Sequence, residues 1–228
     1  MSCLLTLLLT AVFTMLIYKG KIQVKIFGSP VKDLLLGICF GVIWIGASVA
    51  VLYLSGILRF AGKNDVQSLP IWLIAALLNV IMQEYLMRGY LFQFLAQKVN
   101  SITAIIISTL LFTVMHGGAF EAGVIAVLNV ITMSVFISLL LLYTGNLLAP
   151  ILAHFIWNSV GGILLGGVLL ADDYPKVLNC TFSGSTLLTS GSAKIEGSVI
   201  VLIVNCLLIL AVHFMIRKHS KKRISWKK

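Results

Sequence analysis

Charged residues are scarce in this sequence. They make up 11% of its 228 residues, whereas hydrophobic residues make up 60%, and the mean hydropathy is +1.07. A soluble domain of this size does not need so much apolar surface, and repeated apolar runs of about 20 residues are typical of transmembrane helices. The composition therefore excludes an ordinary soluble protein and predicts an all-α, polytopic membrane bundle.

Cysteines are also few, and none lies in a CxxC or metal-ligand spacing. A disulfide framework is therefore not expected. The amino terminus lacks the basic region of a secretory signal, so we expect its first apolar run to be a retained span. No repeat of fixed period and no low-complexity linker is visible. The cysteines are Cys3, Cys39, Cys180 and Cys206.

Acidic residues are outnumbered by basic ones, 7 to 17, which gives a net charge of +10. The basic residues gather in the first short loop and in the carboxy-terminal tail. The positive-inside rule and anionic headgroups explain both clusters, so no nucleic-acid partner is expected. Both segments are predicted to be cytoplasmic. They contain Lys19, Lys21, Lys25 and Lys32, and Arg217, Lys218, Lys221, Lys222, Arg223, Lys227 and Lys228.

The apolar runs predict about seven membrane spans, or eight if the second run hides another. Seven spans put the amino terminus outside and the carboxy terminus in the cytoplasm, and the small size favours a bacterial plasma membrane. We divide the chain into amino-terminal spans (1–69), a core (70–170), and a loop, last span and tail (171–228). The expected spans are 2–18, 34–58, 70–95, 102–116, 120–143, 147–170 and 198–216.

Polar clusters at 83–88, 112–116 and 154–158 interrupt these apolar runs. Ionisable side chains at membrane depth are costly, and they are functional candidates by default because they face the bundle interior. The clusters fall on the third, fourth and sixth spans. Together with the fifth span, these are predicted to form a core of four helices around a wet cavity.

Glu84 and Arg88 lie four residues apart, so they share one face of a helix. This spacing fits either a structural ion pair or a general base with an orienting cation. His154 and Asn158 repeat the spacing, and His116 supplies a second imidazole. Such a set fits a catalytic zinc with an open position for water. It equally fits metal-free catalysis with an oxyanion site, and the spacing does not choose between them.

The order of these motifs resembles the CPBP family of CAAX prenyl endopeptidases and bacteriocin-processing or immunity-associated (Abi) proteins. That family's motifs are EExxxR, FxxxH and HxxxN/D, and the likeness covers roughly residues 70–165. Phe112 supplies the aromatic of the second motif and is expected to pack beside His116. Further likeness lies in Arg88-Gly89-Tyr90-Leu91 and in Gly145-Asn146-Leu147-Leu148-Ala149-Pro150.

The resemblance implies a glutamate-dependent intramembrane endopeptidase, commonly classed as a metalloprotease. Carried over by position, the catalytic set is Glu84, Arg88, His116, His154 and Asn158, with His116 and His154 as candidate ligands of a divalent metal such as zinc. The chain has Gln83 where the family has its first glutamate. An amide is not a useful general base, so either Glu84 is the working carboxylate or the chain has weak or lost activity.

Three functions therefore stay open at this point. The first is a protease acting on a membrane-embedded or lipid-modified peptide within the bilayer. The second is a non-catalytic family member that acts as a bacteriocin-immunity factor or membrane scaffold. The third is a small transporter, although the inverted repeat and paired broken helices of such folds are not visible.

Overall fold

A computed structural model describes residues 25–168, 174–185, 188 and 194–225. This part of the chain is mostly helical. Two segments of wide, π-helical turns, η1 and η2, continue α3 and α8. The elements are α2 (Pro30–Leu54), β1 (Leu58–Lys63), α3 (Leu69–Glu84), η1 (Tyr85–Phe92), α4 (Gln93–Lys98), α5 (Ser101–Met115), α6 (Gly118–Ala122), α7 (Val124–Thr144), α8 (Leu148–Asn158), η2 (Ser159–Leu164), β2 (Leu178–Phe182) and α10 (Val199–Ser225).

Four helical stretches of the described part are long and apolar enough to cross a membrane: Pro30–Leu54, Leu69–Lys98, Val124–Thr144 and Val199–Lys218. Two shorter apolar helices are Ser101–Met115 and Leu148–Leu164. All six coincide with spans predicted from the sequence. The remaining predicted span, 2–18, and the basic residues Lys19 and Lys21 lie outside the described residues. The helical architecture is confirmed, and the count of seven spans stays a prediction.

The second apolar run differs from its predicted bounds, 34–58. It forms one continuous helix that ends at Leu54, and Gly56 follows with a φ of 72°, which suits glycine. The chain then enters β1, which pairs antiparallel with β2. This two-stranded ribbon was not predicted, because each strand is short and β2 lies in the long polar loop. The fold is therefore helical with one small sheet.

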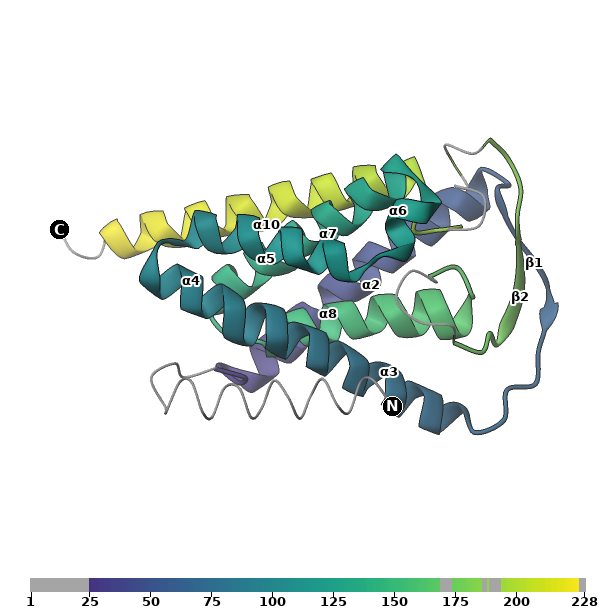
Figure 1. Cartoon of the computed structure of the whole chain (residues 1–228), viewed down its shortest axis with the longest axis horizontal. Coiled ribbons are helices and arrows are strands. Elements are labelled where there is room, and N and C mark those ends of the chain that lie inside the picture. The colour runs from purple at the N-terminus through teal and green to yellow at the C-terminus, as the bar shows by residue number, and fades with distance from the viewer. Residues whose placement is uncertain (1–24, 169–173, 186–187, 189–193, 226–228) are drawn as a thin grey trace.

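The ribbon and the end of α10 lie at opposite ends of the bundle. Figure 1 shows β1 and β2 crossing the end where α3 begins and where α6 lies, whereas α10 runs to the other end. The dark purple start of α2, which carries Lys32, also lies at that other end. The described parts of the two basic segments thus share one end of the molecule, as the positive-inside rule requires.

Helices α2 and α8 pack closely because small residues face each other. A Cβ added to Gly37 would lie 2.9 Å from the Ala149 Cα, and one added to Gly41 would lie 3.1 Å from the Ala153 Cα. Gly37 and Gly41 form a GxxxG pair, which allows backbones to approach in membrane bundles. This contact fixes α8, the helix that carries the third predicted motif.

An aromatic contact next to this close approach ties in a third helix. The rings of Trp44 on α2 and Trp157 on α8 stack with centroids 4.2 Å apart. The Trp44 Nε1 donates a 2.7 Å hydrogen bond to the Asn205 Oδ1 on α10. The outer helices α2 and α10 thus share one hydrophobic core with the helices of the predicted 70–170 region.

Candidate active site

Glu84 lies at the centre of the site. It ends α3, is fully buried, and accepts two hydrogen bonds at the same oxygen. The Nδ1 of His154 lies 2.8 Å from the Glu84 Oε1, and the Arg88 Nη1 lies 3.3 Å from it. The i, i+4 pair predicted from the sequence is therefore formed, and His154 joins it from α8. The other carboxylate oxygen, Oε2, has no hydrogen-bond partner among the described residues.

Arg88 joins α5 and α7 to the first motif. It is fully buried, and its Nη2 donates to the hydroxyl and the backbone carbonyl of Ser134 on α7, at 2.8 and 3.3 Å. The Ser134 hydroxyl also lies 3.1 Å from the hydroxyl of Thr109 on α5. The Arg88 guanidinium stacks over the Phe112 ring at 4.3 Å, a cation–π contact. A buried arginine needs such compensation, because an unpaired buried charge is costly.

In both histidines the ring nitrogen Nδ1 makes a hydrogen bond within the protein. The Nδ1 of His116 lies 2.8 Å from the Phe112 carbonyl oxygen, which only accepts, so His116 donates from Nδ1. His154 likewise directs Nδ1 to the Glu84 carboxylate. In the neutral form of each ring, Nε2 then carries the lone pair. The Phe112 ring lies 4.2 Å from His116, as predicted, and 6.2 Å from His154.

Asn158 lies one turn after His154 on α8, so both side chains project from the same face of that helix. It is buried, and its Nδ2 donates to no partner among the described residues. A buried amide donor of this kind needs a partner. In a peptidase, the oxygen of the scissile carbonyl would supply that partner.

Gln83 and Glu84 form hydrogen bonds with different residues. Adjacent residues on an α-helix project about 100° apart, and both lie in α3 before the π-helical turns begin. Gln83 accordingly bonds through Nε2 to the Asn79 Oδ1 at 3.3 Å, whereas Glu84 bonds to Arg88 and His154. Its Oε1 is buried without a partner in the described structure. Glu84 therefore does not occupy the place of the missing first glutamate.

Both the first and third motifs run directly into π-helical turns. The segment η1 follows Glu84 and contains Arg88, and η2 follows Asn158. Such wide turns are rare and occur frequently at functional sites. Gly161 in η2 lies directly against the Val168 side chain, and its backbone carbonyl accepts from Val168 N, so a larger residue would clash there.

Four residues of this network were missed from the sequence: Thr109, Ser134, Asn79 and Tyr174. Ser134 accepts from Arg88 and lies against Thr109, whereas Asn79 bonds to Gln83 and Tyr174 bonds to Asn79. The first three are polar residues within apolar spans, a signal for interhelical hydrogen bonds that would have identified them. Tyr174 lies in the polar loop, and only the tertiary fold brings it to α3.

A structural or catalytic zinc held by protein takes at least three ligands. Within the described ranges, no group of three or more His, Cys, Asp and Glu residues is placed to hold a metal. His116 and His154 show the Nδ1 bonding usual for metal-ligating histidines, but they are one ligand short. We therefore derive no catalytic step through a metal, and the zinc expectation stays a prediction.

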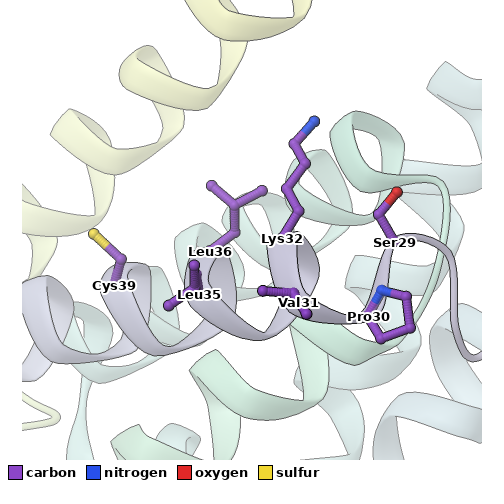
Figure 2. A pocket seen from close by; sticks show the side chains of 7 residues that line it. All are labelled: Ser29, Pro30, Val31, Lys32, Leu35, Leu36 and Cys39. Atoms are coloured by element: carbon purple, nitrogen blue, oxygen red, sulfur yellow. The ribbon is translucent and has the colours of Figure 1, made fainter.

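An open apolar groove of about 720 Å³ runs along the first turns of α2 (Figure 2). It includes none of the motif residues. Its side chains are apolar except for Lys32, Ser29 and Cys39, and Val31 and Leu35 are largely exposed. Such a surface on a candidate membrane span fits contact with lipid.

The chain was compared with known proteins at the level of families, curated sequences and solved structures. A family model described as "Type II CAAX prenyl endopeptidase Rce1-like" matches residues 65–160. Over this range the chain is similar to that family. The range covers less than half of the sequence, yet it includes all five predicted site residues. No curated protein and no solved structure matches the chain.

The Rce1-like match confirms the resemblance drawn from the three motifs. Rce1-like proteins are proteases, so the match supports a hydrolase, and the family acts on prenylated protein substrates in the membrane. Together with the apolar helices, the match supports an integral membrane protein.

Proposed function

We propose that this protein is an intramembrane endopeptidase of the CAAX-processing type whose water is activated by a Glu84–His154 dyad. The 2.8 Å contact between the Glu84 carboxylate and the His154 Nδ1 at full burial carries this proposal. A carboxylate that accepts from Nδ1 orients the imidazole and stabilises the imidazolium that forms when Nε2 takes a proton. Glu84 then acts through His154 rather than on water directly.

The steps follow the acid–base cycle of hydrolysis. His154 Nε2 takes one proton from water as the water oxygen bonds to the scissile carbonyl carbon. The carbonyl electrons move to oxygen, and Asn158 Nδ2 donates a hydrogen bond to that oxyanion. His154 then returns the proton to the leaving amine as the C–N bond breaks. One peptide bond and one water give a carboxylic acid and an amine.

The remaining residues position this dyad. Arg88 holds Glu84 through their shared hydrogen bond and is itself fixed by Ser134. His116, held by the Phe112 carbonyl, offers its Nε2 as an acceptor for a backbone N–H of the peptide. This arrangement needs no carboxylate at position 83, which is why Gln83 is compatible with activity.

The substrate we propose is a membrane-embedded or lipid-modified peptide that enters from the bilayer. We further propose that the end of the bundle where α2 begins and α10 ends is cytoplasmic, since both elements lead into the basic segments of the sequence. The ribbon of β1 and β2 would then lie on the opposite, outer side. In that orientation the amino terminus is outside if the first predicted span crosses the membrane. The small size of the chain favours a bacterial plasma membrane as its location.

Cleavage of a quenched, prenylated peptide by reconstituted protein tests the dyad. We expect wild type to cut, and Glu84→Gln and His154→Ala to lose activity by about 10³-fold or more, as for a disabled catalytic base and its orienting carboxylate. Asn158→Ala should cost about 10²-fold, the effect of losing one oxyanion donor. Cleavage that survives both dyad substitutions would refute the proposal.

The geometry also supports a second candidate, a catalytically weak family member that serves as an immunity factor or scaffold. The Glu84 Oε1 is shared by Arg88 and His154, and the first motif position holds an amide. The decisive variant is Gln83→Glu. If wild type is silent on every peptide and Gln83→Glu cleaves, the natural protein has lost catalysis and the second candidate stands.

A further inference from the structure

Gln83 is the inner end of a hydrogen-bonded ladder that runs along α3. Its Nε2 donates to the Asn79 Oδ1 at 3.3 Å, and the Asn79 Nδ2 donates to the Tyr174 hydroxyl at 3.3 Å. All three side chains are buried, with exposed fractions of 7 to 8%. Gln83 and Asn79 lie in a candidate membrane span, where polar side chains are costly, and each is bonded to the next member of the ladder.

The outer end of the ladder is fixed by packing. The Tyr174 ring lies in a cluster with Ala76 of α3 and Ile163 of η2. A Cβ added to Gly162 would lie 3.2 Å from the Tyr174 Cδ2, so the ring packs closely against the backbone of η2. The backbone of Val177 donates to the Ile163 carbonyl at 2.8 Å and holds this strand-side segment against η2. Tyr174 is therefore a fixed anchor.

Tyr174 also lines an open groove of about 580 Å³ that includes Trp72 and Lys176. This groove lies where α3 begins, beside the segment that leads into β2. The ladder thus connects the catalytic helix to the ribbon end of the molecule.

The ladder has a chemical consequence for the amide of Gln83. Because its nitrogen is bonded to Asn79, its oxygen, Oε1, is directed elsewhere, and it is buried without a hydrogen-bond partner in the described structure. A free amide oxygen accepts hydrogen bonds but does not take a proton at neutral pH. It is therefore suited to orient a water molecule and unsuited to ionise it.

We propose that Asn79 and Tyr174 are positioning residues that fix the Gln83 amide so that its Oε1 accepts one hydrogen bond from the attacking water. This inference rests on the proposed peptidase function. The water donates its second hydrogen to His154 Nε2, which takes that proton as the new C–O bond forms. With both hydrogens directed, a water lone pair is aimed at the carbonyl carbon, which is the orientation that hydrolysis requires.

A double-mutant cycle on kcat tests the ladder. Tyr174→Phe removes the hydroxyl and keeps the ring, and we expect kcat to fall about fivefold with KM unchanged, as for one lost neutral hydrogen bond. Gln83→Met should lower kcat about tenfold, by loss of the water-orienting acceptor. If Tyr174 acts through Gln83, the double variant should be no slower than Gln83→Met alone.

Tyr53→Phe is the matched control, since Tyr53 is exposed on α2 and lies outside the ladder. It should leave kcat unchanged. Independent, multiplying losses for Tyr174→Phe and Gln83→Met in an active enzyme would overturn the ladder and leave the peptidase function standing. Silence of wild type and of Gln83→Glu on all peptides would instead refute the peptidase function.

A second readout does not depend on turnover. The thermal unfolding midpoint is measured for wild type, Tyr174→Phe, Gln83→Met and the double variant. The shifts of the two single variants should not add up to that of the double variant, because removing either end of the ladder changes the hydrogen bonding of Asn79. A fully additive pair of shifts would show that Tyr174 and Gln83 are not connected through Asn79, and would overturn the inference even if the enzyme is active.

Discussion

The most informative perturbation of the fold is removal of the Arg88 cation. Arg88→Met keeps the length of the side chain and removes its hydrogen bonds to Glu84 and Ser134. Breaking one partner of a fully buried ion pair costs about 3–5 kcal/mol, because the other charge stays buried without compensation. We therefore expect Arg88→Met to lower the free energy of unfolding by an amount in that range.

The double variant separates the ion pair from ordinary packing. Glu84→Gln removes the partner charge and keeps the shape of the side chain. When both charges are gone, no uncompensated ion remains, so the double variant should be more stable than the sum of the two losses by about 1–3 kcal/mol. Unfolding in mild detergent, followed by far-ultraviolet circular dichroism during denaturant titration, measures all four proteins.

Additive losses would refute this reasoning, because they would mean that Glu84 and Arg88 do not compensate each other. His154 is the other group bonded to Glu84 and needs its own control. The cycle is therefore repeated in the His154→Gln background. If the ion pair is the source of the coupling, the coupling between positions 84 and 88 should persist there.

Three further predictions concern packing, orientation and metal. Gly37→Ala should destabilise the protein by about 1–3 kcal/mol, since its Cβ would lie 2.7 Å from the Leu152 Cβ, whereas Gly46→Ala on the same helix, with open space around it, should be neutral or stabilising in the same unfolding assay. Burial raises the pKa of the Cys180 thiol, against a smaller lowering by Lys194, so less thiolate is present at a given pH. In a background with serine at Cys3, Cys39 and Cys206, labelling by a membrane-impermeant maleimide from outside the cell should increase as the pH rises above the range of an ordinary thiol, and it should vanish in Cys180→Ser. Labelling only from the cytoplasmic side would reverse the proposed orientation. A chelator should leave peptide cleavage unchanged; loss of cleavage that added zinc restores would instead support His116 and His154 as metal ligands.

The long elements were predictable because hydrophobic runs of this length have one stable form in a bilayer. All six predicted spans within the described part are helices, including the short one that ends before His116. The ribbon was not predictable from local pattern: Leu58 pairs with Phe182, more than a hundred residues along the chain. Gly56, two residues after the end of α2, was the available signal, and a hydropathy profile does not detect it.

The contacts among the candidate residues were predictable within one helix and less so between helices. The i, i+4 spacing predicted the contact of Glu84 with Arg88, and the resemblance placed His154 in the same set. No spacing within one helix reports which residue of another helix lies opposite, so the bond from Arg88 to Ser134 and that from Asn79 to Tyr174 were missed. Which residues meet between two helices depends on the angle and the distance at which the helices pack. That geometry results from many contacts along both helices, so no single motif in the sequence predicts it.

The position of Glu84 bears directly on how its variants must be interpreted. The same carboxylate oxygen that orients His154 also compensates Arg88, and Arg88 in turn joins α5 and α7 to the site. Loss of cleavage in Glu84→Gln therefore combines a lost dyad with a weakened bundle. His154→Gln separates the two, because Arg88 and Glu84 still compensate each other when the imidazole is gone. A His154→Gln protein that unfolds near the wild-type midpoint and does not cleave would assign the lost activity to chemistry. One that unfolds early would show that His154 is mainly structural, and the dyad would then lose its main support.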